Sequence, residues 1–505
     1  MRRQSLIAAC TAVLAAGCTL APRYERPAAP VDADFPRGGV YDHQPEAAGA
    51  ADKSRSAAGL AAPEIGWRDF FADARLQQLV ELALRNNRNL RVAVLNIEAS
   101  RAQYQIARAA LFPALSAAGS MTRTRTPKDL TLSGKPITTE YSVGLDVSWE
   151  IDFFGRVRSL KDQALAQYFA QAENRKAAEI ALVSAVADQY LTMLAYDDAL
   201  TVTRNTLATA QESFRITKLQ FDTGTGSELA LRQAEGVVEQ ARANLESQQR
   251  LRAQAENALV LLVGEPLPAD LPAGLALDSQ DLLADIPPGL PSDLLARRPD
   301  IAAAEQVLRG ANANIGAARA AFFPRVTLTG SGGTLSPTFG GLFKPGSAAW
   351  SFTPQITLPI FEGGQNVANL DLAHVQKRID IANYEKAIQT AFREVADGLA
   401  ARGTYDNQIR SLALFTSTQR RRLELSEMRY RSGVDSYLSV LTAQTDFYSA
   451  QQQLITARLQ RLTNLVDLYQ ALGGGWLEHT GDTPRPSDAA ADYAQAPGRA
   501  AGKLP

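Results

Sequence analysis

The chain carries one sequence pattern twice, with the two copies about 210 residues apart. Residues 107–113 read ARAALFP and residues 318–324 read ARAAFFP, which agree at six of seven positions. Further along, a second set of residues recurs: Phe221, Gly224, Ser227 and Leu229 return as Tyr430, Gly433, Ser436 and Leu438. Solenoid repeats have periods of roughly 20 to 50 residues. This much longer period therefore predicts two copies of one structural half.

The first residues predict export. Arg2 and Arg3 precede an apolar run that ends in small residues, so we place a secretory signal peptide at residues 1–17. Residues 14–18 read LAAGC and resemble the lipobox of bacterial lipoproteins, although Ala15 stands where that motif usually has Leu. Cys18 is the predicted lipidation site, carrying N-palmitoyl and S-diacylglycerol groups, and Thr19 is compatible with the outer membrane. The alternative is a plain signal peptide with an incidental cysteine.

The composition argues against several classes of function. The formal net charge is -1 at pH 7, so the chain lacks the basic footprint of a nucleic-acid-binding protein. Of the three histidines, His43 and His479 lie in the terminal segments, and His374 stands alone on a predicted helix. We find no pairing of nucleophile and base, no metal-ligand cluster and no phosphate loop. We therefore expect no enzymatic activity, no metal site and no cofactor.

Composition also divides the chain. Residues 18–66 and 477–505 are rich in Pro, Ala and Gly without periodicity, so they are predicted to be a lipidated tether and a disordered tail. The first repeat then covers residues 67–275 and the second covers residues 287–476. The first repeat opens on residues 67–112, which contain neither Gly nor Pro and follow a helical apolar period. We predict one helix there, ended by Pro113.

Each half contains one predicted hairpin of two strands, at residues 114–152 and 325–360. The clearest strand alternates strictly over residues 140–152, with its apolar side formed by Tyr141, Val143, Leu145, Val147, Trp149 and Ile151. Its length, its aromatic residues and its partly acidic opposite side fit a transmembrane β-strand. A soluble half-buried sheet uses the same alternation. The export signal favours the membrane.

Four strands cannot close a membrane barrel. Hydrocarbon does not tolerate an open sheet edge, and the smallest bacterial barrels have about eight strands. If these strands span a membrane, several chains must share one barrel. No run of 18 apolar residues follows the signal peptide, so no helical membrane span is expected.

A very long helix follows each hairpin, at residues 156–223 and 365–431. About 65 residues at about 1.5 Å each extend roughly 100 Å. Each helix ends in a Gly-containing turn, and a second helix returns at residues 228–263 or 437–472. Gly224 and Gly433 are suited to the C-terminal caps, and Ser227 and Ser436 to the next N-caps. The pattern predicts two antiparallel helical hairpins with exposed tips.

Taken together, these features resemble those of the TolC-like outer-membrane factors, and among them the NodT-type outer-membrane lipoproteins of tripartite efflux systems. The resemblance covers residues 67–476. Its motifs occur in order as WRDFF at 67–71, LVELALRNN at 79–87, WEIDFFGR at 149–156, LLARRPDI at 294–301, LPIFEGG at 358–364 and YRSGVD at 430–435.

The resemblance implies a mixed α and β fold that is mostly helical. Three chains of four strands would form a twelve-stranded transmembrane barrel, which continues into a long periplasmic α-helical barrel. The implied function is a passive outer-membrane duct for drugs or other small toxic compounds, working with a periplasmic adaptor and an inner-membrane pump of the resistance-nodulation-division class. Alternatives are a type I secretion or major-facilitator partner, and a non-conducting envelope spacer.

The resemblance also assigns roles to residues of this chain. The tips at Gly224, Ser227, Gly433 and Ser436 match the positions where family members meet the adaptor. Leu438 matches an apolar ring that narrows the inner aperture, and Thr442 stands where many members have Asp, so these two are the predicted periplasmic gate. From the strand pattern, Asp146 and Glu150 are expected in the lumen, where they would favour cations; alternatively, they solvate the rims.

Overall fold

A computed structural model describes residues 19–41, 60–127, 129, 136–283, 286–287, 289 and 291–483. The predicted signal peptide at residues 1–17, Cys18 and residues 484–505 of the predicted tail lie outside the described residues. The chain forms two compact units. Unit 1 comprises residues up to Ala28, Asn96–Ala172 and Ala303–Glu385, and unit 2 comprises Ala29–Leu95, Glu173–Ala302 and residues from Lys386 onward. Each unit therefore draws on both sequence repeats.

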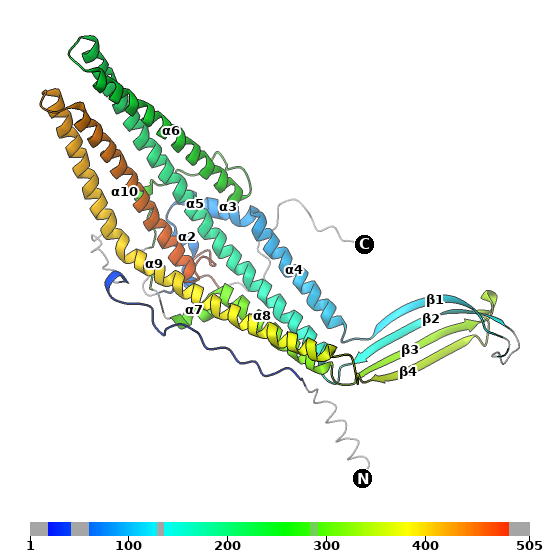
Figure 1. Ribbon diagram of the computed structural model, residues 1–505. Helices are drawn as coiled ribbons and strands as arrows, with labels where there is room; N and C mark the ends of the chain where they lie inside the picture. Colours follow the sequence, from blue (N-terminus) through cyan, green and yellow to red (C-terminus); the bar gives the residue numbers. More distant parts are fainter. Residues whose placement is uncertain are drawn as a thin grey trace. The chain divides into compact units, whose positions relative to one another are not determined.

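Unit 1 contains a sheet of four antiparallel strands in the order β1-β2-β3-β4 (Figure 1). The strands are β1 (Ala114–Arg125), β2 (Ile137–Ile151), β3 (Arg325–Ser336) and β4 (Ala348–Thr357). They are the two predicted hairpins, joined through β2 and β3. A Cβ atom on Gly333 would lie 2.3 Å from the carbonyl oxygen of Val143, so the close approach of β2 and β3 requires glycine there.

The helices of unit 1 are segments of four helices that continue into unit 2. These are α4 (Arg88–Ala109), α5 (Arg156–Asp222), α8 (Pro299–Ala320) and α9 (Gln365–Arg431). In unit 1, α5 and α8 bury small side chains such as Ala166, Ala170 and Ala311 together with Leu308 and Ile315. Small residues on buried helix faces allow close packing. A short 3-10 turn, η6 (Phe339–Gly341), lies between β3 and β4.

Unit 2 contains the two helical hairpins and the connecting helices. The returning helices are α6 (Glu228–Val263) and α10 (Tyr437–Ala471), and the shorter elements are α2 (Trp67–Phe70), α3 (Ala74–Asn86), α7 (Pro291–Arg297), η1 (Gly39–Tyr41), η3 (Ala62–Glu64) and η5 (Leu277–Ser279). Its core includes the rings of Phe70 and Tyr469, which stack with centroids 4.1 Å apart. Both side chains are fully buried.

The stretch predicted as one helix over residues 67–112 is three helices, because two polar caps interrupt it. The Asp73 carboxylate accepts a hydrogen bond from the Arg75 amide and begins α3. Asn87 accepts from the Leu90 amide and donates to the carbonyl of Leu262. Capping side chains satisfy the first amides of a helix, so each one starts a new helix.

The terminal segments predicted as tether and tail are held by contacts where they are described. In unit 2, the ring of Phe35 is buried and stacks on Phe392 with centroids 5.2 Å apart. The amide of Trp67 donates to the carbonyl of Leu477, and Glu478 pairs with Arg68 at 2.7 Å. These segments make ordered contacts because they contain aromatic, aliphatic and charged residues among their Pro and Ala residues.

Of the described helices, α5 has the length and composition that a membrane crossing requires. Its most apolar 18-residue window has a mean hydropathy of 1.2, and 56% of that window is buried inside the protein. The Ala, Leu, Ile and Val residues that fill a helical core also raise the mean hydropathy. A core helix meets the same criterion.

Candidate functional sites at the strands and the hairpin tips

The first hairpin tip joins α5 to α6. Gly224 has a φ of +75°, a left-handed conformation that favours glycine. The amides of Thr225 and Gly226 both donate to the carbonyl of Gln220, which closes the end of α5. The Ser227 hydroxyl accepts a hydrogen bond from the Ala230 amide at 3.2 Å and caps α6. Gly224 and Ser227 thus have the local geometry expected from the sequence.

The second tip joins α9 to α10 and has a different cap. Gly433 has a φ of +73°, like its counterpart. Ser436 occupies the N-cap position of α10, but its side chain makes no capping hydrogen bond, contrary to the sequence prediction. The adjacent Asp435 instead forms a bidentate ion pair with Arg429, with oxygen to nitrogen distances of 2.6 and 2.9 Å. This pair ties the turn to the last residues of α9.

The two predicted gate residues lie on the first turns of α10. The side chain of Leu438 is 54% exposed, and its counterpart in the first repeat, Leu229, is 69% exposed. The hydroxyl of Thr442 donates to the carbonyl of Leu438 at 3.0 Å. This hydroxyl is therefore occupied by the backbone of its own helix, while the leucine side chain is free to make contacts beyond the chain.

Contacts between the two hairpins near the tips were not predicted from the sequence. The Tyr430 hydroxyl on α9 donates to the side-chain carbonyl of Gln220 on α5 at 2.9 Å. Tyr437, Val440 and Ala234 form a small buried cluster beside it, against which Tyr430 packs. Burial raises the pKa of Tyr437 to about 12, with a smaller contribution from Tyr430. The recurrence of an aromatic residue at 221 and 430 was the available signal, but it does not name the partner.

The strand carboxylates differ in their surroundings. Asp146 is exposed on β2, opposite Ser116 of β1 and Ser331 of β3. Glu150 forms two hydrogen bonds with Arg156, at 2.7 and 2.9 Å, and lies 3.8 Å from Arg325. Asp146 is thus an exposed carboxylate, whereas the charge of Glu150 is offset by neighbouring guanidinium groups.

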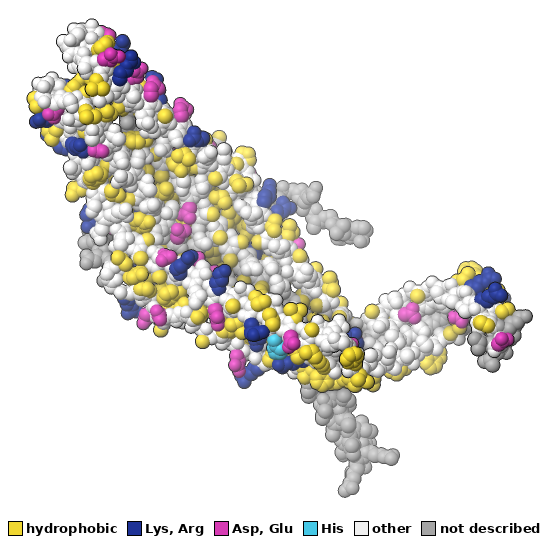
Figure 2. All heavy atoms as spheres, in the orientation of Figure 1, with side chains coloured by type: hydrophobic (Ala, Val, Ile, Leu, Met, Phe, Trp, Pro, Cys, Tyr) yellow, Lys and Arg dark blue, Asp and Glu magenta, His cyan; other side chains and the backbone are white. Residues whose placement is uncertain are grey.

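Apolar side chains gather where the strands of unit 1 meet its helices, as Figure 2 shows on one face. The exposed members are Phe153, Phe322, Phe323, Leu358, Ile360 and Phe361, of which the last two are 93% and 89% exposed. The rings of Phe154 and Phe323 also stack, with centroids 4.8 Å apart. Bands of exposed aromatic residues at the ends of strands are typical of membrane barrels at the interface with water.

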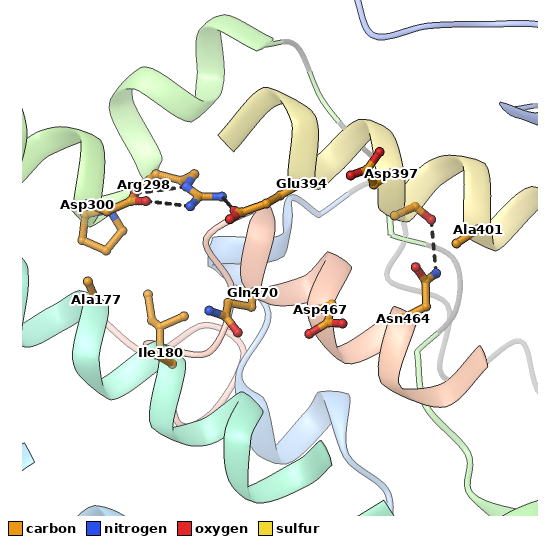
Figure 3. Close-up of a pocket in the computed structure, with 13 residues that line it drawn as sticks. Ala177, Ile180, Arg298, Asp300, Glu394, Asp397, Ala401, Asn464, Asp467 and Gln470 are labelled. Carbon is orange, nitrogen blue, oxygen red and sulfur yellow. Dashed lines mark hydrogen bonds and ion pairs between the residues drawn. The ribbon is translucent and has the colours of Figure 1, made fainter. Parts of the chain in front are cut away.

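Unit 2 contains a cavity of about 620 Å³ lined by residues of α5, α8, α9 and α10 (Figure 3). Arg298 bridges two of its carboxylates, at 2.6 Å from Asp300 and 2.7 Å from Glu394. On α10, burial raises the pKa of Asp467, and the nearby Glu394 raises it further. Burial also raises the pKa of Asp188 on α5, to about 8, and Asp467 adds to that shift.

Within the described residues, no group of three or more His, Cys, Asp or Glu side chains is placed to hold a metal ion.

The fold and these features define a class: an outer-membrane protein made of two homologous halves, each with a strand hairpin and a long helical hairpin. A family described as outer membrane efflux protein matches residues 79–265 and 290–474, one stretch in each repeat. The chain belongs to this family, and the resemblance to the TolC-like outer-membrane factors is confirmed.

Individual relatives extend the match over nearly the whole chain. It is 49% identical over 483 residues to the toluene efflux pump outer membrane protein TtgC of Pseudomonas putida, covering 95% of this chain and 97% of that one. It is 47% identical over 466 residues to the outer membrane protein OprJ of Pseudomonas aeruginosa, covering 91% and 94%. The open-state crystal structure of the Neisseria gonorrhoeae outer membrane channel MtrE is 42% identical, with a TM-score of 0.79 over 92% of this chain and all of that one.

Proposed function

We propose that this protein is the outer-membrane channel of a tripartite efflux pump, a passive exit duct for drugs or other small toxic compounds. One observation carries the proposal: the four strands form a sheet in the order β1-β2-β3-β4, with β1 and β4 at its two edges. Membrane hydrocarbon requires every backbone group to be paired, so the edges must meet other chains. A homotrimer supplies twelve strands, which is enough to close a barrel.

The side chains around the sheet support a position in the outer membrane. Trp350, Phe352 and Ile356 of β4 are 82%, 62% and 71% exposed. Exposed apolar side chains of this size are suited to lipid, and the apolar band at the strand ends is suited to the membrane surface. Lipidation of Cys18 would add an anchor that attaches to the bilayer but does not span it.

The lumen charge follows from the strand carboxylates. Three copies of Asp146 would place three exposed carboxylates inside the barrel and favour cations. Glu150 would contribute less, because its two hydrogen bonds to Arg156 offset its charge. The proposed role of Glu150 is therefore to hold the turn between β2 and α5.

The hairpin tips of unit 2 would meet the partners. Gly224, Ser227, Gly433 and Ser436 lie at the two turns that would dock on a periplasmic adaptor protein, which links the channel to an inner-membrane pump of the resistance-nodulation-division class. The exposed Leu438 would form the apolar ring that closes the aperture, and Thr442 would support it from the next turn. Adaptor docking would shift the tip hairpins outward and open the ring.

Complementation tests the proposed function. The chain is expressed with an adaptor and a pump of the resistance-nodulation-division class in a Gram-negative strain that lacks its own outer-membrane efflux channel, and survival in toluene and in antibiotics is measured. We expect resistance that disappears when either the pump or this chain is omitted. If the protein reaches the outer membrane as a trimer but restores no resistance, a type I secretion or major-facilitator channel, or a non-conducting spacer, is the better assignment.

A further inference from the structure

Residues 19–26, which we call the strap, lie along α8 in unit 1. Arg319 donates to the carbonyl of Leu20 at 3.3 Å, and the side-chain amide of Asn312 donates to the carbonyl of Pro22 at 2.7 Å. The ammonium group of Lys377 on α9 donates to the side-chain oxygen of Asn312 at 2.7 Å. That contact fixes the orientation of the Asn312 amide, so its NH₂ group faces the strap.

The contacts at the C-terminal end of the strap converge on Glu305 of α8, whose side chain is 7% exposed. Arg26 donates to both of its carboxylate oxygens, at 3.1 and 2.6 Å, and the Tyr24 hydroxyl donates to one of them at 3.1 Å. Arg309 donates to the same carboxylate at 2.8 Å and lies over the Tyr24 ring at 5.0 Å. One buried carboxylate thus holds two residues of the strap.

The electrostatics agree with this geometry. Burial acts to raise the pKa of Glu305, but the guanidinium groups of Arg26 and Arg309 outweigh it and hold the pKa below its usual value. The carboxylate therefore stays charged at neutral pH. Burial and the charge of Glu305 raise the pKa of Tyr24 to about 12, so its hydroxyl remains a donor. Charge-assisted hydrogen bonds of this kind are about twice as strong as neutral ones.

Gly316 provides the room in which the strap lies. A Cβ atom at this position would be 2.8 Å from both the amide nitrogen and the Cβ of Ala21, and 2.7 Å from the Ser159 hydroxyl. Backbone cannot yield as a flexible side chain does. Any larger residue at position 316 would therefore push the strap away from α8.

The spacing of these contacts matches the length of an extended strap. Along α8, Glu305 and Arg319 are separated by 14 residues, or about 21 Å at about 1.5 Å per residue. Along the strap, Leu20 and Arg26 are separated by six residues, which cover at most about 21 Å when fully extended. The strap runs antiparallel to the helix, and as an extended chain it reaches both sets of contacts.

We propose that the strap and α8 form a clamp that fixes the lipid anchor beside the membrane sheet, with Glu305 as its positioning residue. Arg319, which holds Leu20, is six residues before the start of β3 at Arg325. Cys18 precedes Leu20 by two residues in the sequence. The clamp therefore presents the acyl chains at the end of α8 nearest the strands, and this role rests on the proposed lipidation of Cys18.

Trypsin tests the clamp in the full-length protein. It cuts after the exposed Arg23, whereas Pro27 protects the bond after Arg26. We expect Glu305→Gln and Gly316→Val to speed cleavage after Arg23 by about tenfold or more, because cleavage follows the population of the open strap. Asp371→Asn, at an exposed carboxylate on α9, is the control and should leave the rate unchanged. Equal rates of cleavage after Arg23 in the unmodified protein and all three variants would overturn the clamp.

Two matched insertions test the register. A Gly-Ser pair between Thr19 and Leu20 leaves every clamp contact in place, whereas the same pair between Pro22 and Arg23 separates the two sets. A nitroxide label on Glu25→Cys, with the protein in lipid vesicles, should stay immobile with the first insertion and become mobile with the second. Equal mobility in the two proteins would overturn the proposed register.

Incorporation of labelled palmitate separates the clamp from the lipidation. We expect palmitate in the unmodified chain and in Glu305→Gln, and none in Cys18→Ala. A chain that takes up no palmitate would overturn the anchor role, even if the strap is protected from trypsin. A lipidated chain whose strap is cut as fast as that of Glu305→Gln would overturn the clamp and leave the lipidation standing.

Discussion

Removing the hydroxyl of Tyr430 should favour the open channel. This hydroxyl donates to Gln220 at 2.9 Å and links the second hairpin to the first near the tips. We propose that the two hairpins of a chain also separate when adaptor docking shifts the tips outward, so that opening the channel breaks this link. Tyr430→Phe removes the hydrogen bond but keeps the ring that packs against Tyr437, at a centroid distance of 5.3 Å.

The size of the effect follows from the burial of the link. A hydrogen bond between neutral groups contributes about 1 kcal/mol net. Gln220 is half-buried, so water hydrates its amide after the substitution and no large additional cost arises. Three copies in a trimer that opens in one step would change the closed-to-open free energy by about 3 kcal/mol, or roughly 100-fold in the open-to-closed ratio.

The assay is the open probability of the purified trimer in planar bilayers. Tyr405→Phe is the matched control, because Tyr405 is a half-buried tyrosine of the same helix whose hydroxyl makes no hydrogen bond to another described residue. We expect Tyr430→Phe to be open far more often than the unmodified protein, and Tyr405→Phe to be unchanged. If both variants are as closed as the unmodified protein, the contact between the hairpins does not hold the channel shut.

Three further predictions follow from single side chains. Leu438→Ala should raise the conductance of the closed trimer and Thr442→Val should not, because the Thr442 hydroxyl already bonds its own helix; equal conductance in both would refute the leucine ring. Burial raises the pKa of Asp188 to about 8, so the stability that this group contributes is full below about pH 4 and is lost as the pH rises through 8. The protein should therefore unfold at a lower temperature at pH 9 than at pH 6. Asp188→Asn should reduce this difference in unfolding temperature. Asp73→Asn should lower the free energy of unfolding by about 3 kcal/mol in denaturant titrations, because the buried Asp73 carboxylate accepts four hydrogen bonds; an unchanged midpoint would contradict this.

The strands and long helices could be predicted because each has a strong local signal. Strict alternation over residues 140–152 gives β2 (Ile137–Ile151), and the absence of Pro over residues 365–431 gives α9 with the same bounds. The glycines at 224 and 433 mark both tips, since each has a positive φ that other residues rarely adopt. Periodicity and turn residues are local properties, so they can be read directly from one chain.

The contacts that depend on distant residues could not be predicted in this way. Glu305 meets residues of the strap that are about 280 positions away, and the Tyr430 hydroxyl meets a side chain 210 positions away. Glu150 was predicted to lie in the lumen or at a rim, and its pairing with Arg156 could not be foreseen, because alternation shows the side of the strand but not the arginine six residues on. The break at Asp73 was missed because a capping carboxylate stands in an otherwise helical period.

Cross-linking of the sheet edges tests the central claim, that chains join edge to edge in one closed barrel. Cysteine replaces Ala118 in β1 and, one position at a time, each residue of β4 in the full-length protein. Within one chain these strands are three spacings apart, about 14 Å, which is beyond the reach of about 7 Å between Cα atoms in a disulfide. Every bond must therefore join two chains. We predict, at the matching register, covalent dimers and trimers and nothing larger, because a closed ring of three leaves no free edge. A membrane-inserted protein that forms no bond at any position, or a ladder that continues beyond the trimer, would contradict the account.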